Sequence, residues 1–164
     1  MIRAIASQDL EAARVAARVK AKFKSNGDHV IMVQHISNRP TATFFLPTTP
    51  GVQLHDSVKL AKGDHHVVKH YPNSFRETNL HELLQSLEVL ELTIIGMMTH
   101  MCIDSTTRQA MHLGLGVTVL DDATGTINLS DDLPAELVHR VELGVLGDGF
   151  ATVTSTHDWA SSLA

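Results

Sequence analysis

The order of hydrophobic and polar residues along the chain predicts alternating helices and strands. Apolar residues between Asp9 and Ser25 recur at helical spacing and predict an amphipathic helix; they are Ala12, Val15, Ala16, Val19 and Phe23. Gly27 should end this helix, because glycine accepts the left-handed conformation of a C-terminal cap. The next segment, His29–Ile36, is a nearly continuous apolar run, which is typical of a strand buried on both faces.

The same alternation continues along the rest of the chain. Short apolar runs predict four further strands, namely His66–Tyr71, Leu92–Met97, Gly116–Asp122 and Phe150–Ser155. Periodic segments predict the helices between and after them, namely one that starts near Asn79, then Cys102–Leu113, Leu133–Leu146 and His157–Leu163. Strands that alternate with helices form a parallel sheet with helices on both faces. We therefore predict a single three-layer α/β/α domain over residues 1–164.

Composition and charge narrow the classes of function. The chain has 164 residues, of which 43% are hydrophobic, so it can bury a core of its own. A net charge of −5 argues against a surface for nucleic acid or anionic membrane, and no apolar run approaches the roughly 18 residues of a membrane span. The single cysteine cannot form an internal disulfide, which fits a reducing cytoplasm. We expect a cytoplasmic protein whose partner is a small molecule, with no nucleic acid and no membrane.

That cysteine, Cys102, occupies a position typical of a nucleophile. It follows the predicted strand Leu92–Met97 and begins the next predicted helix. Ligands of parallel α/β sheets bind at the carboxyl ends of the strands, and the N-terminus of a helix favours a thiolate over a neutral thiol. The other interpretation, a small hydrophobic residue that fills the core, is the commoner role of a lone cysteine. Position alone does not decide between the two.

The sequence around Cys102 decides the question. The segment GMMTHMCIDSTTRQAMHLGLGVTVLDDATGT, Gly96–Thr126, closely resembles the nucleophile region of cysteine hydrolases of the isochorismatase-like family. The segment Val67–Phe75, VVKHYPNSF, resembles the lysine strand of that family and the Asn-Ser-Phe turn after it. A third segment, Phe44–Val58, resembles a loop found in one branch of the family. The resemblance extends over essentially all of the chain from Asp9 onward.

The resemblance implies a hydrolase that cleaves amides or related carbon–nitrogen bonds. Cys102 would attack the carbonyl and form a thioester, which water then hydrolyses, while Lys69 would favour the thiolate by its charge. The backbone N–H groups of Met98 and Cys102 would form the oxyanion hole, with a cis peptide bond between Met97 and Met98. Substrate contacts would come from Phe44, Phe45, Phe75 and His100, although loop aromatics can equally cover the core or an oligomer interface.

The resemblance also bears on cofactors and assembly. The branch of the family with nicotinamidase activity binds a metal through an Asp-x-His motif after the second strand, and the region Gln34–Phe45 contains no such motif. We therefore expect no metal and no other cofactor, and we expect a homo-oligomer.

One part of the family pattern is missing from the sequence. In the family the third member of the triad, an aspartate, ends the first strand of a sheet with strand order 3-2-1-4-5-6, and no such strand precedes the first helix here. A gap should then separate His29–Ile36 from Leu92–Met97. Three alternatives follow: the chain is shorter than the natural protein, Met1–Ala6 is loosely ordered or fills part of the gap, or a partner chain supplies the strand.

These alternatives leave more than one function open. The first interpretation is a hydrolase, either active or impaired. The second is a non-catalytic binding or scaffold protein. A thiol redox protein is disfavoured, because no second cysteine can resolve a disulfide.

Overall fold

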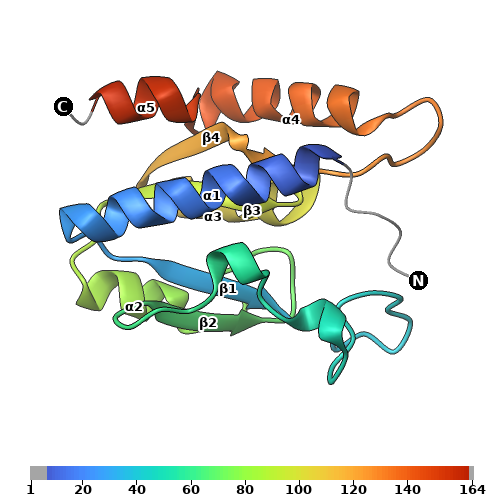
Figure 1. Ribbon diagram of the computed structural model, residues 1–164, viewed down its shortest axis with the longest axis horizontal. Helices are drawn as coiled ribbons and strands as arrows, with labels where there is room; N and C mark the ends of the chain where they lie inside the picture. Colours follow the sequence, from blue (N-terminus) through green and yellow to red (C-terminus); the bar gives the residue numbers. More distant parts are fainter. Residues whose placement is uncertain (1–6, 163–164) are drawn as a thin grey trace.

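The computed structural model describes residues 7–162, which form helices packed around parallel strands (Figure 1). The elements are α1 (Ser7–Asn26), β1 (Ile31–His35), β2 (His65–Lys69), α2 (Leu80–Ser86), β3 (Glu91–Met97), α3 (Asp104–His112), β4 (Gly116–Gly125), α4 (Ala135–Gly149), β5 (Thr152–Thr154) and α5 (Thr156–Ser162). Single helical turns lie at η1 (Pro50–Val52), η2 (Asp56–Val58) and η3 (Thr99–Ile103). None of the helices within residues 7–162 has both the length and the apolar character that a bilayer crossing requires.

The predicted alternation of helices and strands is confirmed, and the differences lie at the ends of elements. Gly27 follows α1 with a φ of 84° and its N–H bonds to the carbonyl of Lys24, as predicted for a capping glycine. Helix α4 continues to Gly149, three residues past its predicted end, because Gly147 lies against Val153 of β5. The predicted helix from Cys102 begins differently, since η3 is a π-helical turn and α3 starts only at Asp104.

The strands form two separate parallel sheets rather than one. Strand β1 pairs with β2, and β3, β4 and β5 pair in that order. Figure 1 shows β1 and β2 below β3 and β4. The part of the chain that the structure describes contains no strand between β1 and β3, which agrees with the strand order expected from the sequence. Met1–Ala6 lie outside the described residues.

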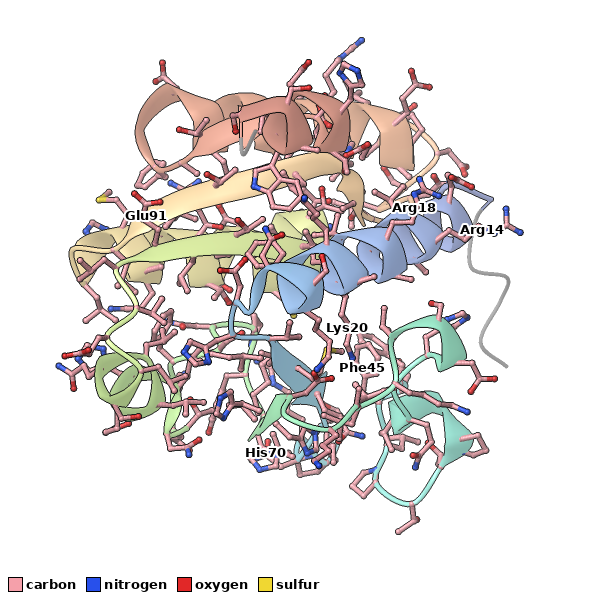
Figure 2. The ribbon with its side chains drawn as sticks, turned by 60° about the vertical axis from the view of Figure 1, so that its left-hand side comes forward. Arg14, Arg18, Lys20, Phe45, His70 and Glu91 are labelled. Carbon is pink, nitrogen blue, oxygen red and sulfur yellow. The ribbon has the colours of Figure 1, made fainter. Side chains whose placement is uncertain are left out.

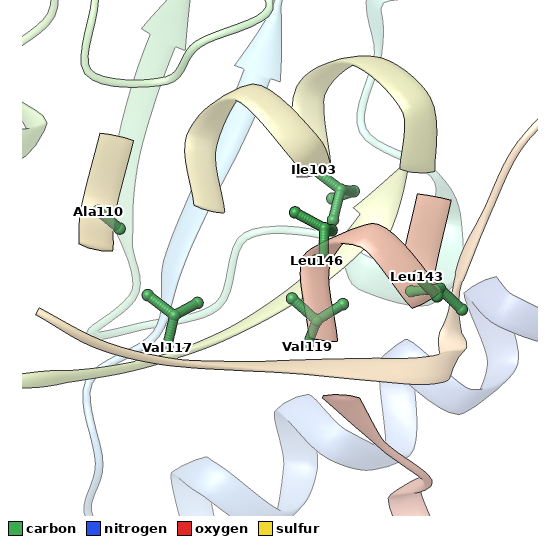
Figure 3. Packing of buried hydrophobic residues seen from close by; sticks show 6 residues of the cluster. All are labelled: Ile103, Ala110, Val117, Val119, Leu143 and Leu146. Atoms are coloured by element: carbon green, nitrogen blue, oxygen red, sulfur yellow. The ribbon is translucent and has the colours of Figure 1, made fainter. Parts of the chain in front are cut away.

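Helices cover both faces of the three-stranded sheet. On one face, Val117 and Val119 of β4 pack against residues of η3, α3 and α4, namely Ile103, Ala110, Leu143 and Leu146 (Figure 3). On the other face, Leu120 and Ala123 of β4 pack against Val15 and Val19 of α1 and Trp159 of α5. The two-stranded sheet has its own cluster, in which Val67 contacts Leu80 and Leu84 of α2. The fold is therefore the three-layer α/β/α arrangement predicted from the sequence.

The first testable prediction concerns Leu146, which is fully buried in the cluster of Figure 3. Replacement by alanine removes the side chain that α4 packs against Val119, and we expect a loss of about 3 kcal/mol of unfolding free energy. Urea unfolding followed by circular dichroism measures this loss. Val141 lies on the same helix and is 54% exposed, so Val141→Ala should change stability by less than about 0.5 kcal/mol. Equal losses in the two variants would contradict the packing of α4 described above.

Helix α1 connects the two sheets through a buried ion-pair cluster. The Nζ atoms of Lys20 and Lys24 lie 2.6 Å from the two carboxylate oxygens of Asp64, whose side chain is fully buried just before β2. Figure 2 shows Lys20 reaching from α1 towards the half of the molecule that contains β1 and β2. Burial by itself raises the pKa of Asp64, but hydrogen bonds from Lys20, Lys24 and the N–H of Ala61 outweigh it and lower the pKa to about 2.

Candidate active site

Cys102 lies in the turn that links β3 to α3. Strand β3 ends at Met97, and Gly96 adopts a φ of 119°, a conformation open to glycine but strained for other residues. The peptide bond between Met97 and Met98 is cis. The N–H groups of Met101 and Ile103 both donate to the carbonyl of Met98, which closes the π-helical turn η3. Cys102 is therefore held at the carboxyl end of β3, half-buried and reduced.

A bulge in β4 supports this turn. Ile94 pairs with Val119, and Gly96 pairs with Thr124. Between these two pairs the chain advances by two residues on β3 but by five residues on β4. The bulge places Gly125 beside Met97, and the hydroxyl of the fully buried Thr99 donates to the carbonyl of Gly125 over 3.0 Å. The ring of His100 hydrogen-bonds the hydroxyl of Thr126. The residues that precede Cys102 are thus fixed from the β4 side.

Lys69 is the last residue of β2 and is buried, with 3% of its surface exposed. Its Nζ donates a hydrogen bond to the carbonyl of Pro72. No carboxylate among the described side chains, those of residues 11–162, forms an ion pair with Lys69. Burying an ammonium group without a carboxylate beside it destabilises the folded state. We therefore expect Lys69 to have a functional role.

Two hydrogen bonds hold the segment after Lys69 against the helix after Cys102. The N–H of Ser74 donates to the hydroxyl of Thr106 over 3.1 Å, and this hydroxyl donates to the hydroxyl of Ser74 over 2.9 Å. Thr106 lies in the first turn of α3, which directly follows the turn that carries Cys102. The pair of hydrogen bonds therefore holds the segment after β2 against the start of α3.

Lys69 and Cys102 line one cavity of about 710 Å³ between the two sheets. Residues of β1 and β3 form its long walls, among them Val33, Leu92 and Ile94, and Ser74 and Thr106 lie with Lys69 and Cys102 in its lining. The cavity runs along the edges of β1 and β3 that are not paired with each other, where the sequence predicts a gap. The structure thus brings the predicted nucleophile and the predicted lysine to the same cavity.

The acidic residues of the cavity lie where the strands begin. They are Asp28, which precedes β1, and Glu88 and Glu91, which lie at the start of β3. Lys69 and Cys102 lie instead where β2 and β3 end, so no acid of the described lining is at their end. Within residues 7–162, no group of three or more histidine, cysteine or acidic side chains is arranged to bind a metal ion.

The predicted substrate-contacting residues are not all at this cavity. Phe75 packs between the cores of the two sheets and lies on a separate surface pocket with Asn73 and Gln109, because the Asn-Ser-Phe turn points it towards α3. Phe44 is 49% exposed on the loop after β1. Neither Phe44 nor Phe75 is among the residues that line the cavity of Cys102 and Lys69, and their contact with substrate stays a prediction. Phe45 is closer to the site, since its ring contacts His35 at a centroid distance of 5.3 Å. Burial lowers the pKa of the His100 ring.

His35 is a strand-end neighbour of Lys69 that the sequence did not single out. It is the last residue of β1 and pairs in register with Lys69, the last residue of β2. Its Nδ1 atom is buried and has no hydrogen-bond partner among the described residues. The signal was present in the sequence, because parallel strands that end together place their final residues side by side.

Comparisons with known proteins agree with this geometry. The Isochorismatase domain family matches residues 3–158. The chain is 42% identical over 149 residues to YddQ of Bacillus subtilis (strain 168), named an uncharacterized isochorismatase family protein, with 89% of this chain and 83% of YddQ aligned. It is 34% identical over 146 residues to a streptothricin hydrolase of Streptomyces noursei, with 84% of this chain and 52% of that enzyme aligned.

A solved structure shows the same fold. The crystal structure of an isochorismatase from Pseudomonas putida KT2440 superposes with a TM-score of 0.85 at 32% sequence identity, covering 93% of this chain and 79% of that one. The fold and the cysteine turn define a hydrolase of the α/β/α class. The chain belongs to the isochorismatase family and is a hydrolase of that family.

Proposed function

We propose that the protein is a cysteine hydrolase that cleaves the carbon–nitrogen bond of a small amide through a thioester on Cys102. The observation that supports this proposal is the shared cavity, which is lined by a half-buried cysteine after β3 and by a buried lysine at the end of β2 that has no ion-pair partner among the side chains of residues 11–162. Two such residues, drawn from different sheets, are poorly explained by packing alone.

In the proposed reaction the thiolate of Cys102 attacks the carbonyl carbon, and the oxygen becomes an oxyanion. The N–H groups of Met98 and Cys102 are the proposed oxyanion donors, because the neighbouring N–H groups of Met101 and Ile103 already bond to the carbonyl of Met98. The carbon–nitrogen bond then breaks, and the amine leaves with a proton, for which the ammonium of Lys69 is the proposed donor. Water hydrolyses the thioester, which releases the acid and restores the thiol.

Lys69 has a second proposed role in this scheme. Its positive charge offsets the negative charge of the thiolate before attack, which favours the reactive form of Cys102. For substrate contacts we propose Phe45 and His100, whose neighbours His35 and Thr126 lie at the carboxyl ends of β1 and β4.

Intact-protein mass spectrometry tests the proposal. We expect the native protein, mixed with a panel of small primary amides and quenched in acid, to gain the mass of an acyl group, with release of ammonia. The matched control is Cys102→Ala, which should gain no mass with any amide. Rapid alkylation of Cys102 without acyl adduct or ammonia would instead support a non-catalytic binding or scaffold protein.

A further inference from the structure

His139 of α4 is hydrogen-bonded at both ring nitrogens to the region that supports the cysteine turn. Its Nδ1 lies 2.8 Å from the hydroxyl oxygen of Thr99, the first residue of η3. Its Nε2 lies 3.2 Å from the carbonyl oxygen of Asp121, which belongs to the bulge of β4. Thr99 is fully buried and His139 is half-buried. One side chain of α4 therefore connects the turn of Cys102 to the bulge beside it.

The hydrogen bonds of Thr99 limit where the protons of this network lie. The Thr99 hydroxyl has a single hydrogen, and the carbonyl of Gly125, 3.0 Å away, only accepts. When that hydrogen points to Gly125, the Nδ1 of His139 has to donate to Thr99. The carbonyl of Asp121 also only accepts, so Nε2 has to donate as well. All three bonds form together only when both ring nitrogens of His139 carry a proton.

Removal of one proton from His139 breaks one of these bonds. In a neutral ring with its hydrogen on Nε2, the bond to Asp121 remains and Nδ1 becomes an acceptor. The Thr99 hydroxyl then turns its hydrogen towards Nδ1, which releases the carbonyl of Gly125. The bond that is lost is the one that ties the first residue of η3 to the end of β4.

We propose that His139 is a positioning residue for the attack by Cys102 and that it acts in its protonated form. The inference rests on the proposed function, because the backbone that His139 holds carries the proposed oxyanion donors. Thr99 directly follows Met98 and precedes Cys102 by three residues. The bonds of Thr99 to Gly125 and His139 therefore fix the backbone between the two donor N–H groups, and His139 acts on the reaction through Thr99.

Other charged groups lie on the elements packed against α4, which are η3, α3, β4 and β5. Strand β5 contributes no titratable side chain. On α4 within one turn of His139, and on the other elements near the cysteine turn and the bulge, the charged or titratable side chains are His100, Cys102, Asp104, Arg108, Asp121, Asp122, Glu136, Arg140 and Glu142. A test of the inference therefore has to separate His139 from these groups.

Two reagents that modify Cys102 by different chemistry provide the test. With p-nitrophenyl acetate the sulfur bonds to the acetyl carbon through a tetrahedral oxyanion, and p-nitrophenolate leaves. With iodoacetamide the sulfur displaces iodide directly, and no oxyanion forms. Both reactions need the thiolate, so the ionisation of Cys102 cancels in the ratio of the acylation rate to the alkylation rate. Both rates are followed by intact-protein mass spectrometry, with glutathione as the reference thiol.

The ratio reports the oxyanion site, and its dependence on pH reports His139. We expect the ratio for the protein, relative to that for glutathione, to fall about 10-fold as the pH rises from about 5.5 to about 8.5, the range in which histidines titrate. The direction follows from the network, since the protonated ring holds all three bonds and the neutral ring releases one.

Variants keep or remove one part of the network at a time. His139→Asn places an N–H near the position of Nδ1 that does not titrate, so the ratio should stay within about 3-fold of the wild-type value at about pH 6 and should no longer change with pH. Thr99→Ser keeps the hydroxyl and should behave as the wild type. Thr99→Val should have a ratio about 10-fold lower at about pH 6 that does not change with pH. His157→Asn, where 88% of the side chain is exposed on α5, is the matched control and should keep the wild-type profile.

The results distinguish this inference from the proposed function. A wild-type ratio that does not change with pH overturns the positioning role of His139, as does a fall that persists in His139→Asn. A Thr99→Val protein with the wild-type profile also overturns it, and this comparison with Thr99→Ser does not depend on the folding of the His139 variant. In each case the acyl adduct of a small amide on Cys102 still forms. Absence of any acetyl adduct on Cys102 in the wild type overturns both.

Discussion

Replacing Lys69 with methionine is expected to slow hydrolysis about 100-fold without lowering the melting temperature. Methionine keeps the volume of the buried chain and removes its charge. Because no carboxylate among the side chains of residues 11–162 pairs with Lys69, the change leaves no described carboxylate unpaired, and the carbonyl of Pro72 loses one donor. Replacement of a buried charge by an apolar side chain is often neutral or stabilising in such a setting.

The two effects are measured on the same preparation. Hydrolysis is followed as ammonia release from whichever amide forms the adduct, and stability by differential scanning calorimetry. Alkylation of Cys102 by iodoacetamide should also slow, by about 10-fold, since the thiolate loses a neighbouring positive charge. Lys22→Met, on the exposed face of α1, is the control and should change neither rate. A Lys69→Met protein that is fully active, or that melts well below wild type, would show that Lys69 is structural.

Replacing Asp64 with alanine is expected to cost about 2–3 kcal/mol of unfolding free energy. The change leaves the ammonium groups of Lys20 and Lys24 without the carboxylate that both contact at 2.6 Å. It also removes the acceptor of the Ala61 N–H. Chemical unfolding at pH 7 measures the loss. The matched control is Asp56→Ala. Asp56 pairs with Lys59 on the surface, and 87% of its side chain is exposed. This variant should have the same unfolding free energy as the wild type.

The difference in unfolding free energy between the wild type and Asp64→Ala should depend on pH, and the pKa of Asp64 gives the direction of that dependence. The pKa of Asp64 is lowered to about 2 in the folded protein, whereas that of an unfolded aspartate is about 3.9. The stabilisation that the Asp64 carboxylate gives to the folded state is therefore complete above about pH 4 and is lost as the pH falls through about 2. Lys24 is about one third exposed, so solvent screens its share and we take the pH-dependent part as about 1 kcal/mol. The gap between wild type and Asp64→Ala should narrow from pH 5 to pH 2.5, and a gap that widens would refute the assignment.

The local pattern of the sequence was enough to predict α1, its end at Gly27 and the succession of helices and strands along the chain. These features depend on periodicity and on the conformational freedom of one residue, both of which are visible within about twenty positions. The meeting of Lys69 and Cys102 in one cavity followed from parallel topology together with the family resemblance. Both residues end or follow a strand, so both lie at the same edge.

Other features of the site depend on contacts between distant segments. The bulge between Val119 and Thr124 exists only because β4 pairs with β3 on both sides of it, and no single segment encodes that register. The resemblance proposes Phe75 as a substrate contact; the Ser74–Thr106 hydrogen bonds hold its turn against α3, and the ring packs against the clusters of both sheets. His35 was missed because a histidine at the end of a strand has no meaning until its neighbour on the next strand is known.

The division into two sheets implies two cooperative units in hydrogen exchange. Within residues 7–162 no ladder hydrogen bonds join β1 to β3, so the β1–β2 half can open without breaking the backbone pairing of β3, β4 and β5. Helix α1 packs on β4 and holds the other half through Asp64, so the ion-pair cluster contributes to the free energy of that opening, together with the Ser74–Thr106 hydrogen bonds. Each opening event separates Lys69 from Cys102, and the fraction of molecules competent for attack therefore depends on a contact at the far side of α1.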